Sequence, residues 1–217
     1  MKHIFALIVA NLRAYVPINI FRGGQETVYT KIRDAIIKGI RTMYIEGPTG
    51  MGKSFIQSTL ADAIINGSDL KVLLLVPKIT LLSQMQREFI KFAKHLMLGL
   101  FGGRHKRSHD NQVTVMTYQS FLNVPDELLE QYSVFFLDEA HKALGPKTRA
   151  KLERQKHAIH IGFTATPTYD EKRNLKEFLK YEVYRISIPE AVKVGMLSAI
   201  QFIIGKVQIE ISGKKKT

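Results

Sequence analysis

The sequence predicts an α/β fold in which a mostly parallel β-sheet carries helices on both faces. Short apolar runs alternate along the chain with segments whose apolar residues recur at helical spacing. A glycine-rich loop at residues 47–54 joins one apolar run to a helical segment, and Asp138 and Glu139 directly follow another apolar run. Strands and helices that alternate in this way form βαβ units, and such units build a parallel sheet.

The individual elements can be assigned in chain order. Apolar runs predict strands at residues 42–46, 71–76, 97–101, 113–117, 134–138, 158–163 and 182–187. Helical spacing predicts helices at residues 25–38, 53–66, 79–95, 147–156, 171–180 and 189–194. Pro77 ends the second strand, and Asn66-Gly67 is a stop signal for the helix that follows the glycine-rich loop.

The length of 217 residues suits one domain, or one domain and a small appendage. Hydrophobic residues make up 45% of the chain, which is enough for a core. No internal repeat is visible, and no linker divides residues 20–190. We therefore expect a structural N-terminal element at residues 1–20, a main domain at residues 21–197, and a C-terminal strand with a basic tail at residues 198–217.

Composition excludes several classes of protein. The chain contains no cysteine, so it has no disulfide framework, no thiol nucleophile and no cysteine-based zinc site. No apolar run approaches the roughly 18 residues of a membrane span, so no membrane partner is expected. Residues 4–10 are apolar, but Asn11 and Arg13 follow them closely. We interpret this segment as a structural element rather than as a signal peptide.

Residues 47–54 read Gly-Pro-Thr-Gly-Met-Gly-Lys-Ser and match the phosphate-binding pattern GxxxxGK[ST]. Glycine has no Cβ, so this backbone can curl and turn its N–H groups inward around an anion. Lys53 is expected to reach the β- and γ-phosphates, and the Ser54 hydroxyl to ligate Mg²⁺. The N-terminal end of the following helix adds positive potential. The loop therefore predicts a nucleoside triphosphate bound with magnesium.

Asp138 and Glu139 stand at the end of the apolar run 134–137. In open α/β sheets this carboxyl edge of the strands is where ligands bind. We expect Asp138 to hold magnesium through water and Glu139 to orient or deprotonate the attacking water. An isolated acidic pair is more often a solvated turn. Its place after a strand, in a chain with a phosphate loop, favours the catalytic interpretation.

The net charge of +13, from 32 basic and 19 acidic residues, indicates a polyanion partner. Basic residues cluster at residues 104–109, 147–156 and 214–216. Any one of these clusters is compatible with an ordinary solvated surface. The total charge, however, favours nucleic acid.

The order of these motifs resembles the first RecA-like lobe of superfamily 2 helicases and translocases, in their DEAH-type branch. That branch includes the motor parts of restriction enzymes and DNA repair or recombination helicases. Residues 47–54 match motif I, Asp-Glu-Ala-His at residues 138–141 matches motif II, and Thr-Ala-Thr-Pro at residues 164–167 matches motif III. The resemblance covers about residues 21–197. It implies a RecA-like P-loop NTPase domain that uses ATP and Mg²⁺ and acts on nucleic acid. DNA is favoured over RNA, because motifs II and III look most like the DNA repair and restriction branch.

The resemblance also implies roles for individual residues. It assigns catalytic roles to Lys53, Asp138, Glu139 and His141, and magnesium to Ser54 and Asp138. It assigns ATP contacts to Arg22, Gln25, Pro48, Thr49, Gly50, Met51, Gly52, Lys53 and Ser54, with Gln25 reading adenine. It assigns nucleic-acid contacts to Lys78, Gln84, Gly103, Arg104 and Thr117, and coupling between the two sites to Thr164 and Thr166. The family often has an aromatic residue just before the adenine-reading glutamine, whereas this chain has Gly23-Gly24.

The family's second RecA-like lobe carries arginine fingers, and the 217 residues contain nothing that resembles it. An arginine finger accelerates phosphoryl transfer by several orders of magnitude. Stepping along a strand also needs two grips that move relative to each other. We therefore expect a second RecA-like lobe in cis or in trans. We favour a piece of a longer helicase over a naturally short relative. We also expect a cytoplasmic location, where an ATP site belongs, or a location in the nucleoid or, in a eukaryote, the nucleus.

The motifs and the charge of the chain discriminate between four candidate functions. The favoured one is the ATP-binding lobe of a nucleic-acid-dependent ATPase, a helicase or translocase. The alternative is a non-catalytic module that binds nucleotide and nucleic acid without useful turnover. A small-molecule kinase would need an arginine-bearing lid, and motifs II and III argue against it. A GTPase would need an Asn-Lys-x-Asp guanine reader, which the sequence lacks.

Overall fold

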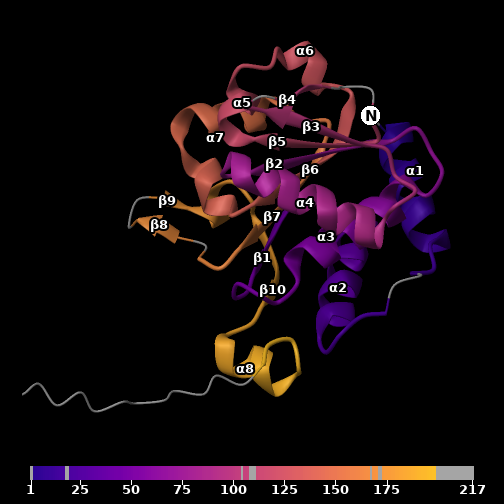
Figure 1. The fold of residues 1–217 in the computed structure, drawn as a ribbon, viewed down its shortest axis with the longest axis vertical. Coiled ribbons are helices and arrows are strands. Elements are labelled where there is room, and N and C mark those ends of the chain that lie inside the picture. Colours follow the sequence, from indigo (N-terminus) through magenta and orange to yellow (C-terminus); the bar gives the residue numbers. More distant parts are fainter. Residues whose placement is uncertain are drawn as a thin grey trace, which may run out of the picture.

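The computed structural model describes residues 2–17, 20–103, 105–107, 111–166, 168–170 and 173–198. Its centre is an eight-stranded sheet with the strand order β10-β1-β7-β6-β2-β5-β3-β4 (Figure 1). The strands from β10 to β3 in this order are parallel, and β4 runs antiparallel to β3. The predicted α/β fold with a mostly parallel sheet is therefore confirmed.

The strands of the main sheet are β1 (Thr42–Glu46), β2 (Lys71–Val76), β3 (Leu98–Gly102), β4 (His105–Arg107), β5 (Val113–Thr117), β6 (Tyr132–Asp138), β7 (Ile159–Thr164) and β10 (Tyr181–Arg185). A separate hairpin pairs β8 (Thr168–Asp170) with β9 (Arg173–Asn174). All the strands predicted from apolar runs are present, and no strand end differs from the prediction by more than two residues.

The helices are α1 (Lys2–Ala14), α2 (Gln25–Ile37), α3 (Lys53–Ile65), α4 (Ile79–Phe92), α5 (Tyr118–Leu122), α6 (Asp126–Leu129), α7 (Pro146–Arg154) and α8 (Ile188–Lys193). Two 3₁₀ helices, η1 (Ala140–Leu144) and η2 (Leu175–Glu177), complete the described elements. In Figure 1, α8 lies beyond the end of β10, and its Ala191 is fully buried in the core that α1 to α4 share. None of the helices in the described ranges is both long and apolar enough to cross a membrane.

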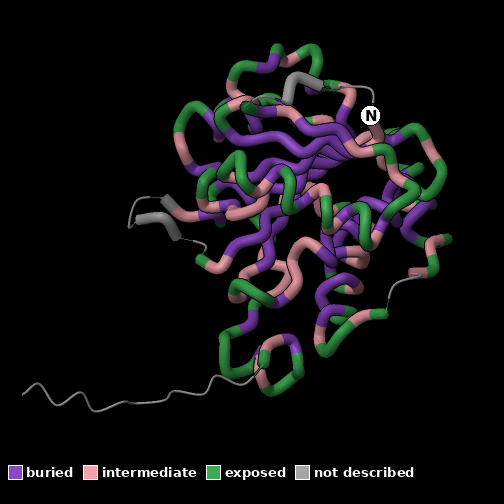
Figure 2. The backbone as a smooth tube through the Cα atoms, viewed as in Figure 1, coloured by how far each residue is buried: buried purple, intermediate pink, exposed green. Residues whose placement is uncertain are grey.

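The sheet is buried on both faces, and alternate residues of each strand enter two different cores. In β2, Val72 and Leu74 pack with the apolar faces of α1 to α4, whereas Leu73 and Leu75 pack with α5, α7 and the two 3₁₀ helices. Figure 2 shows the strands as a buried band between more exposed helices. Burial on both faces explains why these strands are continuous apolar runs in the sequence rather than alternating ones.

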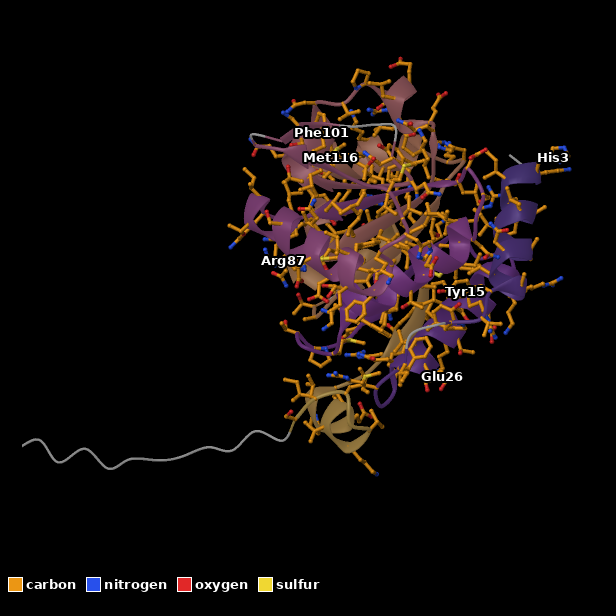
Figure 3. All side chains as sticks on the ribbon, turned by 45° about the vertical axis from the view of Figure 1, so that its right-hand side comes forward. His3, Tyr15, Glu26, Arg87, Phe101 and Met116 are labelled. Carbon is orange, nitrogen blue, oxygen red and sulfur yellow. The ribbon has the colours of Figure 1, made fainter. Side chains whose placement is uncertain are left out.

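Residues 2–14 form α1, which packs against α3. The Asn11 side chain donates hydrogen bonds from Nδ2 to the carbonyl oxygens of Ile64 (2.7 Å) and Ile65 (3.0 Å). The Tyr15 hydroxyl donates to Asp62, which also pairs with Nε2 of His95 at 2.7 Å. In Figure 3, α1 runs along the edge of the molecule from His3, and Tyr15 lies nearer to the rest of the domain. The polar contacts fix this helix over the end of α3.

The helix predicted at residues 171–180 is wrong. Among its described residues, Arg173 and Asn174 form strand β9, and Leu175–Glu177 is a single 3₁₀ turn that Asn174 caps. The apolar residues that suggested a helix, Leu175, Phe178 and Leu179, are buried in the core under the sheet. One short turn is enough to bury them, because β10 begins at Tyr181 and leaves no room for a longer helix. The strand and basic tail predicted at residues 198–217 lie, apart from Ser198, outside the described residues.

Candidate nucleotide-binding and catalytic site

The phosphate loop connects the end of β1 to the start of α3. Gly50 (φ +89°) and Gly52 (φ +86°) adopt left-handed backbone conformations that favour glycine. A Cβ at Gly52 would lie 2.2 Å from Nε2 of Gln25, so this position has no room for a side chain either. The Gly47 N–H donates to the carbonyl oxygen of Thr164 (2.9 Å), which fixes the start of the loop to the end of β7. These contacts set the curvature that an anion-binding loop needs.

A cavity of about 460 Å³ lies beside this loop. It is lined by Thr49, Gly50, Gly52, Lys53, Ser54 and Gln57 of the loop and α3, by Leu81, Gln84, Met85 and Glu88 of α4, and by Asp138 and Glu139 after β6. The structure thus brings together Lys53, Ser54, Asp138 and Glu139, which the sequence placed in motifs more than 80 residues apart. Within this lining Lys53 is the only basic residue.

The two acidic residues have different backbone environments. Asp138 is the last residue of β6, and its carbonyl oxygen accepts a hydrogen bond from the Tyr118 hydroxyl (3.0 Å). Glu139 has a φ of +47°, which is strained for a residue with a side chain. Such strain persists only where the surrounding structure determines the conformation, and it is common at functional sites.

Burial and charge perturb the titration of this group of side chains. Burial and the neighbouring Glu139 carboxylate raise the pKa of Asp138, Lys53 and Gln57 act in the opposite direction, and the net result is a pKa of about 6. Burial lowers the pKa of Lys53, against the attraction of Glu139 and Asp138. Desolvated, oppositely charged groups held this close are typical of a site that binds a charged ligand.

His141 of motif II and Thr164 and Thr166 of motif III form one hydrogen-bonded group. Nδ1 of His141 lies 3.1 Å from Oγ1 of Thr164, and 3.5 Å from the Glu139 carboxylate. Burial lowers the pKa of His141 below its ordinary value. The Thr164 hydroxyl also donates to the carbonyl oxygen of Thr166 (2.8 Å). The predicted coupling residues Thr164 and Thr166 therefore contact each other and the catalytic motif through His141.

A second cavity of about 320 Å³ continues from the first, since both are lined by Gly50, Gly52, Ser54 and Glu88. Its other lining residues are Ile20, Arg22, Gln25, Phe55, Lys91, Phe92 and Met196. The Phe55 ring packs edge-on against Phe92, with 4.9 Å between ring centroids. The predicted adenine contacts Arg22 and Gln25 thus lie next to the phosphate loop, in a cavity with an aromatic wall.

Gln25 is buried, and both ends of its amide are used within the protein. Nε2 donates to the carbonyl oxygen of Met51 (3.1 Å), and Oε1 accepts from the backbone N–H of Arg22 (2.9 Å). The glycines before it are required by packing, because a Cβ at Gly23 would lie 2.4 Å from the carbonyl oxygen of Val194. The loop after α8 therefore occupies the space that a larger residue before Gln25 would need.

The predicted nucleic-acid contacts are not all presented to solvent. Lys78 is exposed at the N-terminus of α4, and Gly103 is exposed beside Ile79, an exposed apolar residue. Thr117 is buried, and its hydroxyl caps α5 by accepting from the Ser120 N–H (3.1 Å). Gln84 is exposed on α4 and also lines the phosphate cavity. Arg104 lies outside the described residues.

The structure adds residues that sequence reasoning did not single out. Gln57 and Glu88 line the phosphate cavity, and Tyr118 contacts the backbone of Asp138. For Gln57 a signal was available, because a residue four positions after Lys53 lies on the same face of the helix. Nothing in the spacing indicated Glu88 or Tyr118, which reach the site only through the packing of α4 and α5.

The donor groups fit magnesium bound together with a triphosphate. Among the described residues, no cluster of three or more His, Cys, Asp or Glu side chains could hold a metal ion by itself. Magnesium, however, is usually held by one or two carboxylates together with phosphate oxygens and waters. Ser54 and Asp138 supply a hydroxyl and a carboxylate at one cavity, next to a loop that can bind the phosphates.

Comparison with known proteins supports the same assignment. A family model described as "Type III restriction enzyme, res subunit" matches residues 19–169. The chain belongs to this family. Together with the relatives below, this makes it the first RecA-like lobe of a superfamily 2 helicase, related to the motors of restriction enzymes.

Among its relatives, the ATP-dependent DNA helicase uvsW of Enterobacteria phage T4 is 32% identical to this chain over 155 residues. The endonuclease subunit of a Type I restriction enzyme of Staphylococcus aureus (strain COL) is 32% identical over 143 residues. These matches cover 68% and 59% of this chain, but only 31% and 15% of the relatives. The chain thus spans less than a third of the length of either protein.

The crystal structure of the UvsW helicase from bacteriophage T4 superposes on this lobe with a TM-score of 0.64, covering 85% of this chain and 67% of that chain. At 20% sequence identity this likeness shows the fold alone. It confirms the RecA-like architecture independently of the sequence motifs.

Proposed function

We propose that the chain is the ATP-binding lobe of a DNA-dependent ATPase of the helicase or translocase type. In this role, ATP hydrolysis is coupled to movement on DNA or to its remodelling. The observation that carries the proposal is the convergence of Lys53, Ser54, Asp138 and Glu139 on one cavity beside the phosphate loop. A cation, a hydroxyl and two carboxylates in that arrangement are what phosphoryl transfer from ATP to water requires.

Each of these side chains then has a role. The N–H groups of the loop and the Lys53 ammonium bind the phosphates, while Ser54 and Asp138 hold the metal. A bound magnesium ion supplies charge neutralisation on the transferred phosphoryl group. Glu139 accepts a proton from the attacking water or orients it, and its strained backbone fixes its position. The adjoining cavity with Arg22 and Gln25 takes the adenine base.

DNA is the proposed polyanion for two reasons. The relatives carry names that refer to DNA helicase and restriction activities, and the chain has a net charge of +13. Lys78 and Gly103 are exposed at the carboxyl edge of the sheet and can contact sugars and phosphates, so binding should be largely independent of sequence. A second RecA-like lobe, in cis or in trans, would supply a second binding surface for the DNA strand.

One observation favours the alternative, a nucleotide- and nucleic-acid-binding module without turnover. Lys53 is the only cation among the residues that line the phosphate cavity in the described part of the chain. Phosphoryl transfer in related NTPases gains several orders of magnitude in rate from a second cation, the arginine finger. Without that cation, the lobe alone would bind ATP and hydrolyse it slowly.

The deciding experiment measures ATP binding and steady-state ATP hydrolysis, with and without single-stranded DNA. We expect the Lys53→Ala variant to lose ATP affinity severely, because the loop loses its cation. The Glu139→Gln variant should bind ATP normally and lose turnover. Hydrolysis by Glu139→Gln at the parental rate would disprove the role of Glu139. ATP binding with no turnover in the parent, even with DNA, would establish the binding-module alternative for the lobe by itself.

A further inference from the structure

Gln57 is a buried polar residue whose side-chain amide lacks hydrogen-bond partners at normal distances. It lies in α3 with 0% of its surface exposed, and neither its Nε2 nor its Oε1 has a partner within 3.5 Å, although the amide lies close enough to Asp138 to lower the pKa of that carboxyl. A buried amide without partners costs free energy, so native proteins keep few of them. Such a group therefore needs an explanation, and one explanation is a partner that arrives with the ligand.

The position of Gln57 indicates which ligand that is. It follows Lys53 by four residues, so both side chains project from the same face of α3. Gln57 lines the phosphate cavity together with Ser54 and Asp138, the two residues suited to hold magnesium. The unsatisfied amide therefore lies in the wall of the proposed metal–triphosphate site rather than in a purely apolar core.

The chemistry of the amide fits a place between a carboxylate and a metal-bound water. An ionised carboxylate only accepts hydrogen bonds, and a water that gives its lone pair to magnesium mainly donates them. A glutamine amide offers two donors on nitrogen and an acceptor on oxygen, so it can satisfy both groups at once. Neither leucine nor glutamate in this position could do so.

We propose that Gln57 is a positioning residue of the magnesium–triphosphate site. Its Nε2 donates to the Asp138 carboxylate, and its Oε1 accepts from a water in the coordination sphere of the metal. The inference deepens the proposed function and rests on it. Groups in this outer position orient the ligands of a metal, and their loss commonly weakens metal binding by at least tenfold.

The test uses Gln57→Met, which keeps the length of the side chain and removes both hydrogen-bonding ends. The affinity for an ATP analogue is measured by calorimetry, with excess EDTA and across a magnesium titration. We expect the magnesium-dependent gain in affinity to fall about tenfold, while the affinity without metal stays at the parental value. Because the variant removes an unsatisfied amide, its melting temperature without ligand should equal or exceed that of the parent.

Thr59→Val is the matched control. Thr59 lies on the same helix, is fully buried, and has an unpartnered hydroxyl, but it does not line the cavity. We expect this variant to keep the parental magnesium response. A parental magnesium response in Gln57→Met would overturn the inference. So would a lower melting temperature with equal losses of affinity in EDTA and in magnesium, because that result means a structural role. If the parent itself shows no magnesium-dependent ATP binding, the proposed function fails first.

Discussion

At the scale of single residues, Tyr118 connects two parts of the site that the sequence motifs keep apart. It follows Thr117, an expected nucleic-acid contact, and its hydroxyl donates to the Asp138 carbonyl oxygen at 3.0 Å. Its ring is buried, and burial, together with the nearby Asp138 and Glu139 carboxylates, raises its pKa well above the ordinary value. The hydroxyl is therefore a permanent donor. A displacement of α5 by a bound nucleic-acid strand would therefore act on the backbone of Asp138, for which we propose a role in metal binding.

We expect Tyr118→Phe to destabilise the lobe by about 1 kcal/mol, since a buried carbonyl loses its partner. The affinity for magnesium–ATP should also fall severalfold, because the backbone of Asp138 loses the hydrogen bond from the Tyr118 hydroxyl that fixes its position. Urea unfolding and a magnesium-dependent ATP titration measure the two effects. Tyr132→Phe is the control, because the Tyr132 hydroxyl makes a similar buried hydrogen bond to Thr114 (3.0 Å) away from the cavity. Equal losses of ATP affinity in both variants would contradict the special role of Tyr118.

Residues with roles set by local spacing could be predicted from the sequence, and residues with roles set by packing could not. The phosphate loop fixes Lys53 and Ser54 within a few residues of its glycines. Gln84 was expected to contact nucleic acid, and the packing of α4 against α3 also places this exposed side chain in the lining of the phosphate cavity. Thr117 was expected at the same surface, but its hydroxyl is used to cap a helix too short to be recognised in the sequence.

At the scale of elements, Asn11 is the side chain within α1 that makes polar contacts to the end of α3, and Tyr15, just after α1, donates to Asp62. Nδ2 of Asn11 donates to the carbonyl oxygens of Ile64 and Ile65, at the end of α3, where no intrahelical donor remains. The rest of the contact is apolar and includes the buried Ile8 and Leu12. Asn11 therefore fixes the position of α1 along α3, while the apolar residues supply most of the attraction.

We expect Asn11→Ala to lower the free energy of unfolding by about 1 to 2 kcal/mol, because the buried Ile64 carbonyl loses its donor, whereas the Ile65 carbonyl still accepts from the Ser68 N–H at 2.7 Å. ATP affinity should be unchanged, since this end of α3 lies a full helix length from Lys53. Denaturant unfolding and ATP titration measure the two quantities. Asn123→Ala is the comparison, because the exposed Asn123 makes one long bond of 3.3 Å to Gln119. If both substitutions cost the same, the docking is governed by the apolar contacts alone.

Elements that are buried on both sides were predictable, and short surface elements were not. The strands could be assigned because their residues enter both cores and so form unbroken apolar runs. The helix prediction at residues 171–180 was wrong for a physical reason. Leu175, Phe178 and Leu179 have helical spacing. In the structure, a single 3₁₀ turn between β9 and β10 is enough to bury all three side chains. Periodicity indicates which residues are buried, not how many turns the backbone makes.

At the scale of the whole molecule, the parallel sheet organises the site. The ends of β1, β6 and β7 lie side by side, so the loops that follow them carry motifs I, II and III to one edge. The sequence was sufficient to predict this arrangement, because parallel βαβ units place all strand ends on the same side. It was not sufficient to predict that the cavity lined by Arg22 and Gln25 continues into the phosphate cavity. That continuity depends on α4 and on the loop after α8, which are brought together only by the complete fold.

The centre of the sheet also contains a histidine that should make folding sensitive to acid. His160 in β7 is buried between the rings of Phe135 and Phe178, at centroid distances of 5.2 and 5.7 Å. Burial lowers its pKa to about 3, and the nearby His157 acts in the same direction. In the unfolded chain, its pKa returns to about 6.5. Between these values the unfolded chain takes up a proton that the folded one does not, so stability falls as the pH decreases from about 6.5 towards 3.

We expect His160→Leu, which fills a similar volume without a titrating group, to lose this part of the pH dependence. Between pH 4.5 and 6, its unfolding free energy should change less steeply than that of the parent, by up to about 1.4 kcal/mol per pH unit. Urea unfolding at several pH values measures the difference, in which the contributions of the carboxylates cancel. His3→Gln is the control, because His3 is exposed at the far end of α1 (Figure 3) and should leave the slope unchanged. Parallel curves for parent and His160→Leu would mean that the folded protein admits a proton at His160, and that the centre of the sheet opens to water well above pH 3.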